Sequence, residues 1–186
     1  MSFVVGAGLN KKQDDFLSQT TFSAKKQIEQ FVENYIGVTE TMAKDDHLQE
    51  ALAKATKTAP LSASSELNYI INMSNNYMAQ YSDILGLGFA SIDENYIYDQ
   101  AGVRYDLLLN ERPYFNMASG GTYVTEPYID SITGELCVSI ATPVSSNNKT
   151  VGMVIVDLEL TQISVFLQQL HFAETGRVVL LSAYNM

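Results

Sequence analysis

The strongest constraint on the fold is a pair of strand-like segments near the end of the chain, separated by a short polar loop. Residues 136–143 alternate in character, and residues 151–160 are β-branched and apolar until Asp157 interrupts them. Alternation with a period of two and β-branched apolar runs both predict strands. The polar loop at 145–149 is typical of a hairpin. We therefore expect an antiparallel sheet whose clearest pair lies here.

The N-terminal third has the periodicity of a long helix. Apolar residues recur in alternating steps of four and three, which keeps one seam on one side of the helix. Asp45 and Asp46 could interrupt or re-cap this helix, because aspartate is a good N-cap. Coiled-coil contact with a second copy and packing against the chain's own sheet both explain the seam. The seam consists of Leu17, Thr21, Ala24, Ile28, Phe31, Tyr35, Val38 and Met42.

The middle of the chain predicts a second helix and further strands. A linker rich in proline and serine at 58–65 precedes residues 67–81, whose apolar side chains share one helical face. Residues 84–92 then indicate a strand in which Gly86 and Gly88 would let another backbone or a ligand approach. Two long helices, a sheet of about five antiparallel strands and one short inserted helix predict an α+β domain.

The region between these helices and the strand pair holds the polar candidates for a binding site. Residues 111–118, which include the Arg-Pro-Tyr-Phe sequence, predict a short helix, because proline costs nothing in the first helical turn. Arg112 would then lie at the mouth of that helix. Residues 125–130 predict an edge strand entering a turn, and 131–135 supply the hairpin that follows.

Asp157 has two interpretations at the end of its strand. An aspartate inside an apolar strand is expensive unless a cation or several donors face it, because burial removes the solvation of the charge. Asp157 could cap a helix that begins near Thr161, or it could contact the amine of a ligand. Both roles are compatible in one residue.

These segments resemble the motifs of double-Cache sensor domains, the extracytoplasmic PAS-like domains of bacterial chemoreceptors, histidine kinases and diguanylate cyclases. Residues 112–115 are similar to the family's Arg-Pro-Trp-Tyr and 126–130 to its Glu-Pro-Tyr-x-Asp. Residues 151–157 are similar to its strand ending in Gly-x-Asp-Ile. The resemblance covers most of the chain. It implies a Cache domain that senses a small polar metabolite.

The same resemblance implies a set of ligand contacts. In amino-acid-binding members, the residues matching Arg112 and Tyr114 hold the ligand carboxylate, and those matching Tyr128, Asp130 and Asp157 hold its ammonium. An arginine fork suits a carboxylate, and a carboxylate pair with a phenol suits an ammonium, so such a site selects a zwitterion. The expected contacts are Arg112, Tyr114, Phe115, Tyr128, Asp130 and Asp157.

This sequence departs from the amino-acid-binding pattern in three places. Tyr114 stands where the family has Trp, Phe115 stands where it has Tyr, and Leu107 lies where another Tyr is expected. For Arg112 the alternative to ligand binding is a surface ion pair with Glu111 or Glu126. Arg104 is a weaker candidate contact. Six tyrosines fall around the expected pocket, which they could line or merely pack beside: Tyr96, Tyr98, Tyr105, Tyr114, Tyr123 and Tyr128.

Domain organisation also follows from the resemblance. We expect a stalk helix over 1–57, a membrane-distal ligand-binding domain over 58–170 and the start of a truncated membrane-proximal module over 171–186. The stalk seam makes a homodimer plausible. Since no stretch reaches the ~20 apolar residues of a membrane helix, the membrane anchor of the full-length protein would lie outside this sequence. The domain itself would be extracytoplasmic, either periplasmic or extracellular.

Composition and motifs exclude several other functions. The net charge of −10 does not supply the basic patch that nucleic acid requires. No catalytic fingerprint occurs, so an enzyme is not expected. Cys137 and the two histidines, His47 and His171, form no recognisable metal motif, and we expect neither a metal nor a cofactor. The alternative function is an interaction module that dimerises and binds a partner protein without a small-molecule ligand.

Overall fold

The computed structural model describes residues 11–161 and 165. The chain forms two compact units, one of Asn34–Leu160 and the other of Met1–Glu33 with Thr161–Met186. The larger unit combines helices with an antiparallel sheet, so the α+β prediction is confirmed. The expected membrane-proximal module at 171–186 lies outside the described residues.

Three α-helices come first in the described chain: α1 (Lys11–Ala43), α2 (Asp46–Lys54) and α3 (Leu67–Gln80). The predicted helix over 1–57 is therefore divided, because Asp45 re-caps the chain. Its side chain accepts a hydrogen bond of 3.0 Å from the backbone N–H of Leu48, which satisfies a donor that the new helix leaves free. A 3-10 turn, η1 (Leu61–Ala63), then leads toward α3.

The last part of the predicted seam packs within the larger unit. Tyr35, Val38 and Met42 are each no more than 4% exposed. The hydroxyl of Tyr35 also donates a 2.9 Å hydrogen bond to the carboxylate of Asp83, ahead of the first strand. Core packing is therefore confirmed for this part of the seam, and the dimer interpretation stays a prediction for the rest.

The sheet has seven strands in the order β3-β2-β1-β7-β6-β4, and β5 also pairs with β6. All pairs are antiparallel. Of these strands, β5 is a two-residue part of the edge strand predicted over 125–130, whereas β3 and the two-residue β4 were not predicted. The strands are β1 (Ile84–Ser91), β2 (Tyr96–Asp99), β3 (Arg104–Leu108), β4 (Tyr123–Val124), β5 (Tyr128–Ile129), β6 (Leu136–Ser146) and β7 (Lys149–Glu159).

The predicted hairpin between β6 and β7 is confirmed. Asn147 and Asn148 both have positive φ, 51° and 60°. Two left-handed residues make the turn whose twist matches antiparallel strands, and asparagine tolerates this conformation best after glycine. The resulting register places Ser139 of β6 opposite Asp157 of β7.

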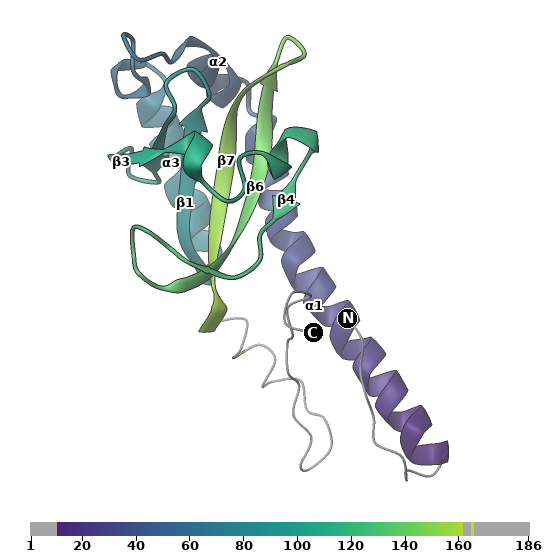
Figure 1. The fold of residues 1–186 in the computed structure, drawn as a ribbon. Helices are drawn as coiled ribbons and strands as arrows, with labels where there is room; N and C mark the ends of the chain where they lie inside the picture. The colour runs from purple at the N-terminus through teal and green to yellow at the C-terminus, as the bar shows by residue number, and fades with distance from the viewer. Residues whose placement is uncertain (1–10, 162–164, 166–186) are drawn as a thin grey trace. The chain divides into compact units, whose positions relative to one another are not determined.

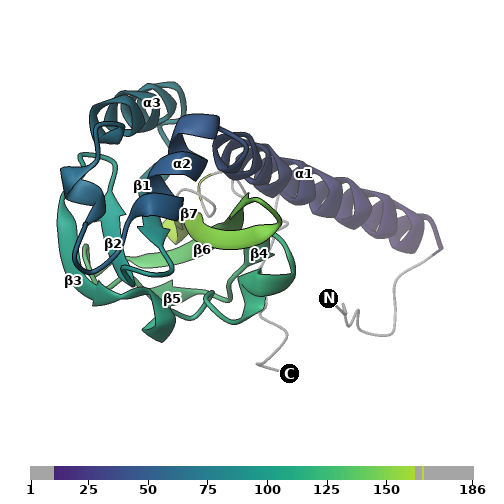
Figure 2. The same ribbon diagram turned by 90° about the horizontal axis from the view of Figure 1, so that it is seen from above.

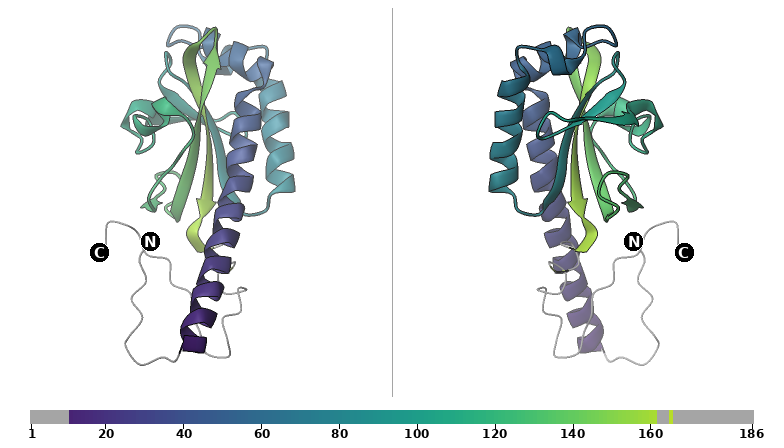
Figure 3. Two further views of the ribbon diagram at one scale, coloured as in Figure 1. Left: turned by 90° about the vertical axis from the view of Figure 1, so that its right-hand side faces the viewer. Right: turned by 90° about the vertical axis from the view of Figure 1, so that its left-hand side faces the viewer.

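Helices and loops cover opposite faces of this sheet. Helix α3 and the C-terminal part of α1 lie against one face, and the segment 109–135 lies against the other (Figure 3). Helix α2 packs on β6 and β7 near their hairpin end (Figures 1 and 2). Leu52 of α2 lies so close to Gly152 of β7 that a Cβ there would meet its Cδ1 at 2.7 Å. The face covered by irregular chain is the one that leaves room for a cavity.

The continuous short helix predicted over 111–118 is wrong. Residues 112–116 form a turn between two 3-10 turns, η2 (Leu109–Glu111) and η3 (Met117–Gly120). Arg112 is extended, with φ −81° and ψ 147°. The ring of Pro113 disfavours the helical conformation for the residue before it, which explains the interruption. Arg112 thus ends η2 and does not open a helix.

Candidate functional site

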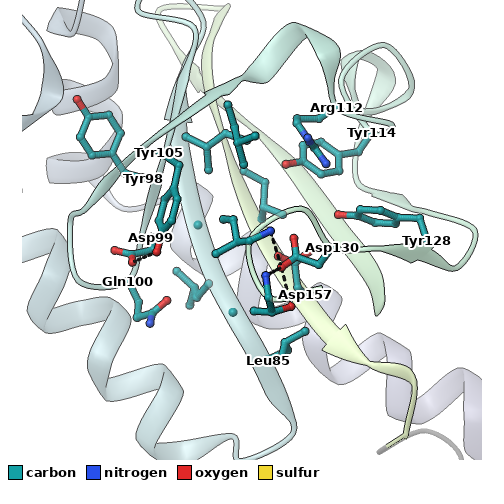
Figure 4. A pocket seen from close by; sticks show the side chains of 18 residues that line it. Leu85, Tyr98, Asp99, Gln100, Tyr105, Arg112, Tyr114, Tyr128, Asp130 and Asp157 are labelled. Carbon is teal, nitrogen blue, oxygen red and sulfur yellow. Dashed lines mark hydrogen bonds between the residues drawn. The ribbon is translucent and has the colours of Figure 1, made fainter. Parts of the chain in front are cut away.

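A cavity of about 180 Å³ lies between the sheet and the segment that covers it. Its walls come from β1, β2, β3 and β7 on one side and from the residues after η2 and β5 on the other (Figure 4). It is small compared with the pockets of drug-sized ligands. The polar residues on its walls are Asp99, Gln100, Tyr105, Arg112, Tyr114, Tyr128, Asp130, Thr133 and Asp157.

Five of the six residues predicted to contact a ligand line this cavity: Arg112, Tyr114, Tyr128, Asp130 and Asp157. Phe115 does not lie on its walls. It packs instead against a core cluster that includes Leu109 and Ala118. Tyr114 belongs to the same cluster and also lines the cavity, whereas Phe115 is only half-buried against the cluster.

Arg112 lies at one end of the cavity beside Tyr114 (Figure 4). Its Nη2 donates a 3.1 Å hydrogen bond to Oγ of Ser131, in the turn after β5. Tyr114 is only 3% exposed. Burial raises the pKa of Tyr114 well above its usual value, with a further contribution from the Asp157 carboxylate. This end therefore presents a cation and a neutral phenol.

Asp130 holds its own turn together while it lines the cavity. Its Oδ2 accepts hydrogen bonds from the backbone N–H of Ile132 (3.2 Å) and from both the N–H and the hydroxyl of Thr133 (2.7 and 2.8 Å). Donors of this kind stabilise an ionised carboxylate. All three of these bonds go to Oδ2, while the residue also lines the cavity.

Asp157 is held from the sheet side. Its Oδ1 accepts a hydrogen bond from the hydroxyl of Ser139, which in turn lies 2.6 Å from the hydroxyl of Tyr128. The side chain lines the cavity (Figure 4), as the ligand-contact interpretation requires. The pKa of the Asp157 carboxyl is raised to about 7, mainly by burial and also by the nearby Asp130, against the opposing effects of the hydrogen bond from Ser139 and the charge of Arg112.

Two glycines of β1 open the floor of the cavity. A Cβ at Gly86 would meet Oδ2 of Asp157 at 3.7 Å, and one at Gly88 would meet the backbone oxygen of Tyr98 at 3.2 Å. Larger residues here would fill the space over the carboxylate. The prediction that these glycines allow close approach is consistent with their place on the wall.

The far end of the cavity was not predicted as a site. Asp99 accepts hydrogen bonds of 2.9 Å from the N–H groups of Ala101 and Val103, and one of 3.2 Å from the hydroxyl of Tyr105. Gln100 lies beside it (Figure 4). Aspartate often accepts hydrogen bonds from the backbone of the turn that follows it. Asp99, three residues before Gly102, was therefore a sequence signal for this turn.

Arg104 and the remaining tyrosines make contacts outside the cavity. The Arg104 guanidinium stacks 4.6 Å from the centre of the Tyr96 ring, a cation–π contact, and neither residue lines the cavity. Tyr98 contributes to the wall, but its hydroxyl donates a 2.5 Å hydrogen bond to the buried Glu94. Leu107 occupies the wall where the family resemblance placed a tyrosine.

Comparison with known proteins gives this cavity its context. Residues 7–186, nearly the whole chain, match the model of the Cache domain, dCache_1. The chain belongs to the Cache domain family. It is a non-catalytic sensor domain of the type that forms the ligand-binding part of chemoreceptors.

A curated relative and several solved structures are similar to this Cache domain. The methyl-accepting chemotaxis protein PscA of Pseudomonas syringae pv. tomato is 35% identical over 107 residues, 55% of this chain and 17% of PscA. The chain thus spans less than a fifth of that relative's length. It also shares the fold of the PctB ligand-binding domain of Pseudomonas aeruginosa in complex with L-Arg, with a TM-score of 0.69 and 21% identity over 90% of this chain and 66% of PctB.

Two further solved structures have the same fold. The CtaA domain of Pseudomonas fluorescens, in complex with L-valine, has a TM-score of 0.65 and 19% identity, covering 87% of this chain and 68% of CtaA. The PctC domain of P. aeruginosa, in complex with GABA, has a TM-score of 0.63 and 14% identity, covering 83% of this chain and 67% of PctC. At these identities the likeness establishes the fold.

The described part of this Cache domain contains no helix long and apolar enough to cross a membrane. Within the same residues, no group of three or more histidine, cysteine, aspartate or glutamate side chains is placed to bind a metal ion.

Proposed function

We propose that this Cache domain binds a small ligand with an ammonium group and a carboxylate, an amino acid or a related amine or carboxylate. The observation that carries the proposal is the opposition of charges in one cavity. Arg112 stands at one end, and the carboxylates of Asp130 and Asp157 lie on its walls. An arginine fork suits a carboxylate, and two carboxylates with the phenol of Tyr128 suit an ammonium.

The cavity supports a small-molecule sensor over the alternative of an interaction module that binds only a partner protein. An interaction module of that kind needs no cavity beside Arg112, whereas a metabolite sensor needs one. The solved relatives support the same choice, since the PctB, CtaA and PctC domains are in complex with L-Arg, L-valine and GABA, respectively. All three are amines with a carboxylate.

A thermal-shift screen tests the proposal directly. The panel contains the twenty L-amino acids, GABA, simple amines and small carboxylates, with calorimetric titration of each hit. A ligand that binds only the folded state raises the melting temperature by mass action. We expect a stabilising amine-carboxylate. No stabilisation by any compound of the panel would contradict the proposal.

Replacing Arg112 should remove the carboxylate contact. We expect Arg112→Ala to weaken binding of the panel's best amino acid by on the order of 100-fold, because a charge-assisted hydrogen bond contributes about 1.5–3 kcal/mol. The melting temperature without ligand should change little, since Arg112 is only half-buried. Calorimetry measures the affinity.

Arg104→Ala is the matched control for this substitution. It removes a guanidinium that stacks on Tyr96 outside the cavity. Its affinity should equal that of the wild type. Equal losses in both variants would show that Arg112 acts through the general field of the protein and does not contact the ligand.

The affinity should depend on pH through Asp157. Its pKa is raised to about 7 in the ligand-free domain, and an ammonium binds only the ionised carboxylate. Lowering the pH from 8 to 6 should therefore weaken binding about tenfold, since roughly a tenth of the carboxyls stay ionised one unit below the pKa. Calorimetry at both pH values measures this. An Asp157→Asn variant should keep only a residual affinity, and that affinity should not depend on pH between 6 and 8. If the affinity of the wild type did not change with pH, the ionised carboxylate would be excluded as the ammonium contact.

We infer further that the domain serves a membrane-anchored receptor and lies outside the cytoplasm. Cache domains of chemoreceptors support this placement, as does the likeness to PscA. Ligand binding would favour one of two arrangements of the sheet relative to α1, and the stalk helix would pass the change to a cytoplasmic signalling region. Such a switch requires that the ligand bind one state better than the other.

A homodimer through the N-terminal part of α1 stays a prediction, which sedimentation analysis would test.

A further inference from the structure

Ser139 lies behind the cavity wall and touches two residues that form it. Its side chain is fully buried on β6. The register places it opposite Asp157 on β7, while Tyr128 on β5 pairs with Cys137, two residues earlier on the same strand as Ser139. One small hydroxyl therefore meets a carboxylate from one neighbouring strand and a phenol from the other.

The backbone of Ser139 is fixed by Thr125, which fits a positioning role. The N–H of Ser139 donates to Oγ1 of Thr125 at 2.9 Å, and the N–H of Thr125 donates to the carbonyl of Ser139 at 2.9 Å. This reciprocal pair holds β6 at the point where β4 ends and the chain runs toward β5. The hydroxyl of Ser139 thus has a defined position before any ligand arrives.

Proton counting then fixes the direction of the hydrogen bonds. Serine has one hydroxyl proton, and an ionised carboxylate can only accept. Ser139 must give its proton to Asp157, so the 2.6 Å contact with Tyr128 must use the proton of the phenol. The hydroxyl of Tyr128 is left with lone pairs for the cavity. Asp157 and Tyr128 then both face a ligand as acceptors, as an ammonium requires.

We propose that Ser139 is a positioning residue that relays a hydrogen bond from Tyr128 to Asp157 and thereby makes both groups acceptors for the ammonium of the ligand. The proposal rests on the proposed function for the identity of the ligand. The relay itself is a property of the ligand-free domain. If Asp157 becomes protonated, the relay can run in reverse, and Tyr128 then presents a donor that repels an ammonium.

The electrostatic surroundings of Asp157 are consistent with this role. The hydrogen bond from Ser139 lowers the pKa of Asp157, as does Arg112, while burial and Asp130 raise it. Removal of the Ser139 hydroxyl should therefore raise the pKa of Asp157 further and leave the proton of Tyr128 free to point into the cavity. The titratable or charged groups around the relay are Arg112, Tyr114, Tyr128, Asp130 and Cys137.

The decisive test is the titration of Asp157 by carboxyl-carbon NMR in ligand-free Ser139→Ala. We expect its pKa to rise by about one unit, because hydrogen bonding to the charged form is lost. Ser139→Thr keeps a hydroxyl and should restore the wild-type pKa. Thr142→Ala is the matched control, since Thr142 is a buried hydroxyl of the same strand that bonds Thr39 of α1 and Thr122 and not the cavity. It should lower stability without moving the titration.

Binding gives a second readout, with L-Arg, L-valine and GABA as probes. Any of the three that binds the wild type should bind Ser139→Ala about tenfold more weakly at pH 8, and its pH–affinity profile should move upward with the titration of Asp157. An unchanged Asp157 titration in Ser139→Ala would overturn the relay. A shifted titration in a domain that binds none of the amine panel would support the relay and reject the proposed ligand class, so the two failures are distinguishable.

Discussion

Asp157→Asn is expected to weaken ligand binding severely and, at the same time, to make the ligand-free domain more stable at pH 8. The carboxylate that would hold an ammonium is half-buried, and desolvation with the nearby Asp130 outweighs Ser139 and Arg112, so that its pKa is raised to about 7. Asparagine keeps the acceptor for Ser139 and removes the buried charge. The affinity for an amine ligand should fall by 100-fold or more, on the order of 3 kcal/mol, because one charged partner is lost.

The sign of the stability change depends on pH. Between about pH 4 and pH 7 the folded domain holds a proton on Asp157 that the unfolded chain has released, so wild-type stability falls as pH rises through this window. The Asn variant lacks this loss. We expect the two proteins to have equal free energies of unfolding near pH 4. At pH 8 the free energy of unfolding of the variant should be higher by about 2 kcal/mol, a figure reduced to allow for screening by solvent at the cavity.

Urea denaturation at pH 4 and pH 8 measures this difference, and calorimetry measures the affinity. Glu159→Gln is the matched control, because it exchanges a carboxylate for an amide two residues along the same strand and outside the cavity wall. It should leave binding intact. An Asp157→Asn domain that is less stable than the wild type at pH 8 would show that the charge is fully compensated without ligand.

Gly152→Ala is expected to cause the largest loss of stability. A Cβ at this position of β7 would lie 2.3 Å from the backbone oxygen of Ala90 on β1 and 2.7 Å from Cδ1 of Leu52 on α2. The side chain of Leu52 can shift, but the paired backbone of β1 cannot yield without breaking the ladder. We expect a destabilisation of about 3 kcal/mol, at the upper end for overpacking.

Gly37→Ala provides the matched control within the same unit. No atom lies within 4 Å of the added Cβ, and Gly37 is an exposed residue of α1. Because alanine favours helix over glycine, this variant should gain about 0.5–1 kcal/mol. Urea midpoints measure both. A Gly152→Ala midpoint equal to that of the wild type would mean that the paired backbone of β1 yields without cost.

Local patterns were sufficient for the parts of the fold that depend on local physics. The alternation of 136–143 and the apolar run of 151–160 predicted β6 and β7, and Asp157 was recognised because a charge in such a run needs partners. Strand β4 was missed because two residues carry no period, and β5 was predicted only as part of a longer edge strand over 125–130. The break at Asp45 was seen as one of two outcomes, since a good N-cap does not force a helix to end.

The site was predictable where motifs lie close in sequence and missed where folding joins distant segments. Arg112, Tyr114 and Asp130 were found through their motifs and the family resemblance. Asp99 and Gln100 were missed because only the pairing of β1 with β2 and β7 brings their turn to the far end of the cavity. Phe115 was misplaced because a helix was assumed where Pro113 imposes an extended residue before it.

The double use of Asp130 limits how this domain can evolve. One oxygen of its carboxylate accepts the hydrogen bonds that hold the turn after β5, and the residue also lines the cavity. Any change of ligand preference made at this position would also loosen the hairpin that carries it. New specificities should therefore arise first at Gln100, Arg112 or Tyr114, and a directed-evolution library would retain more folded members if Asp130 were held constant.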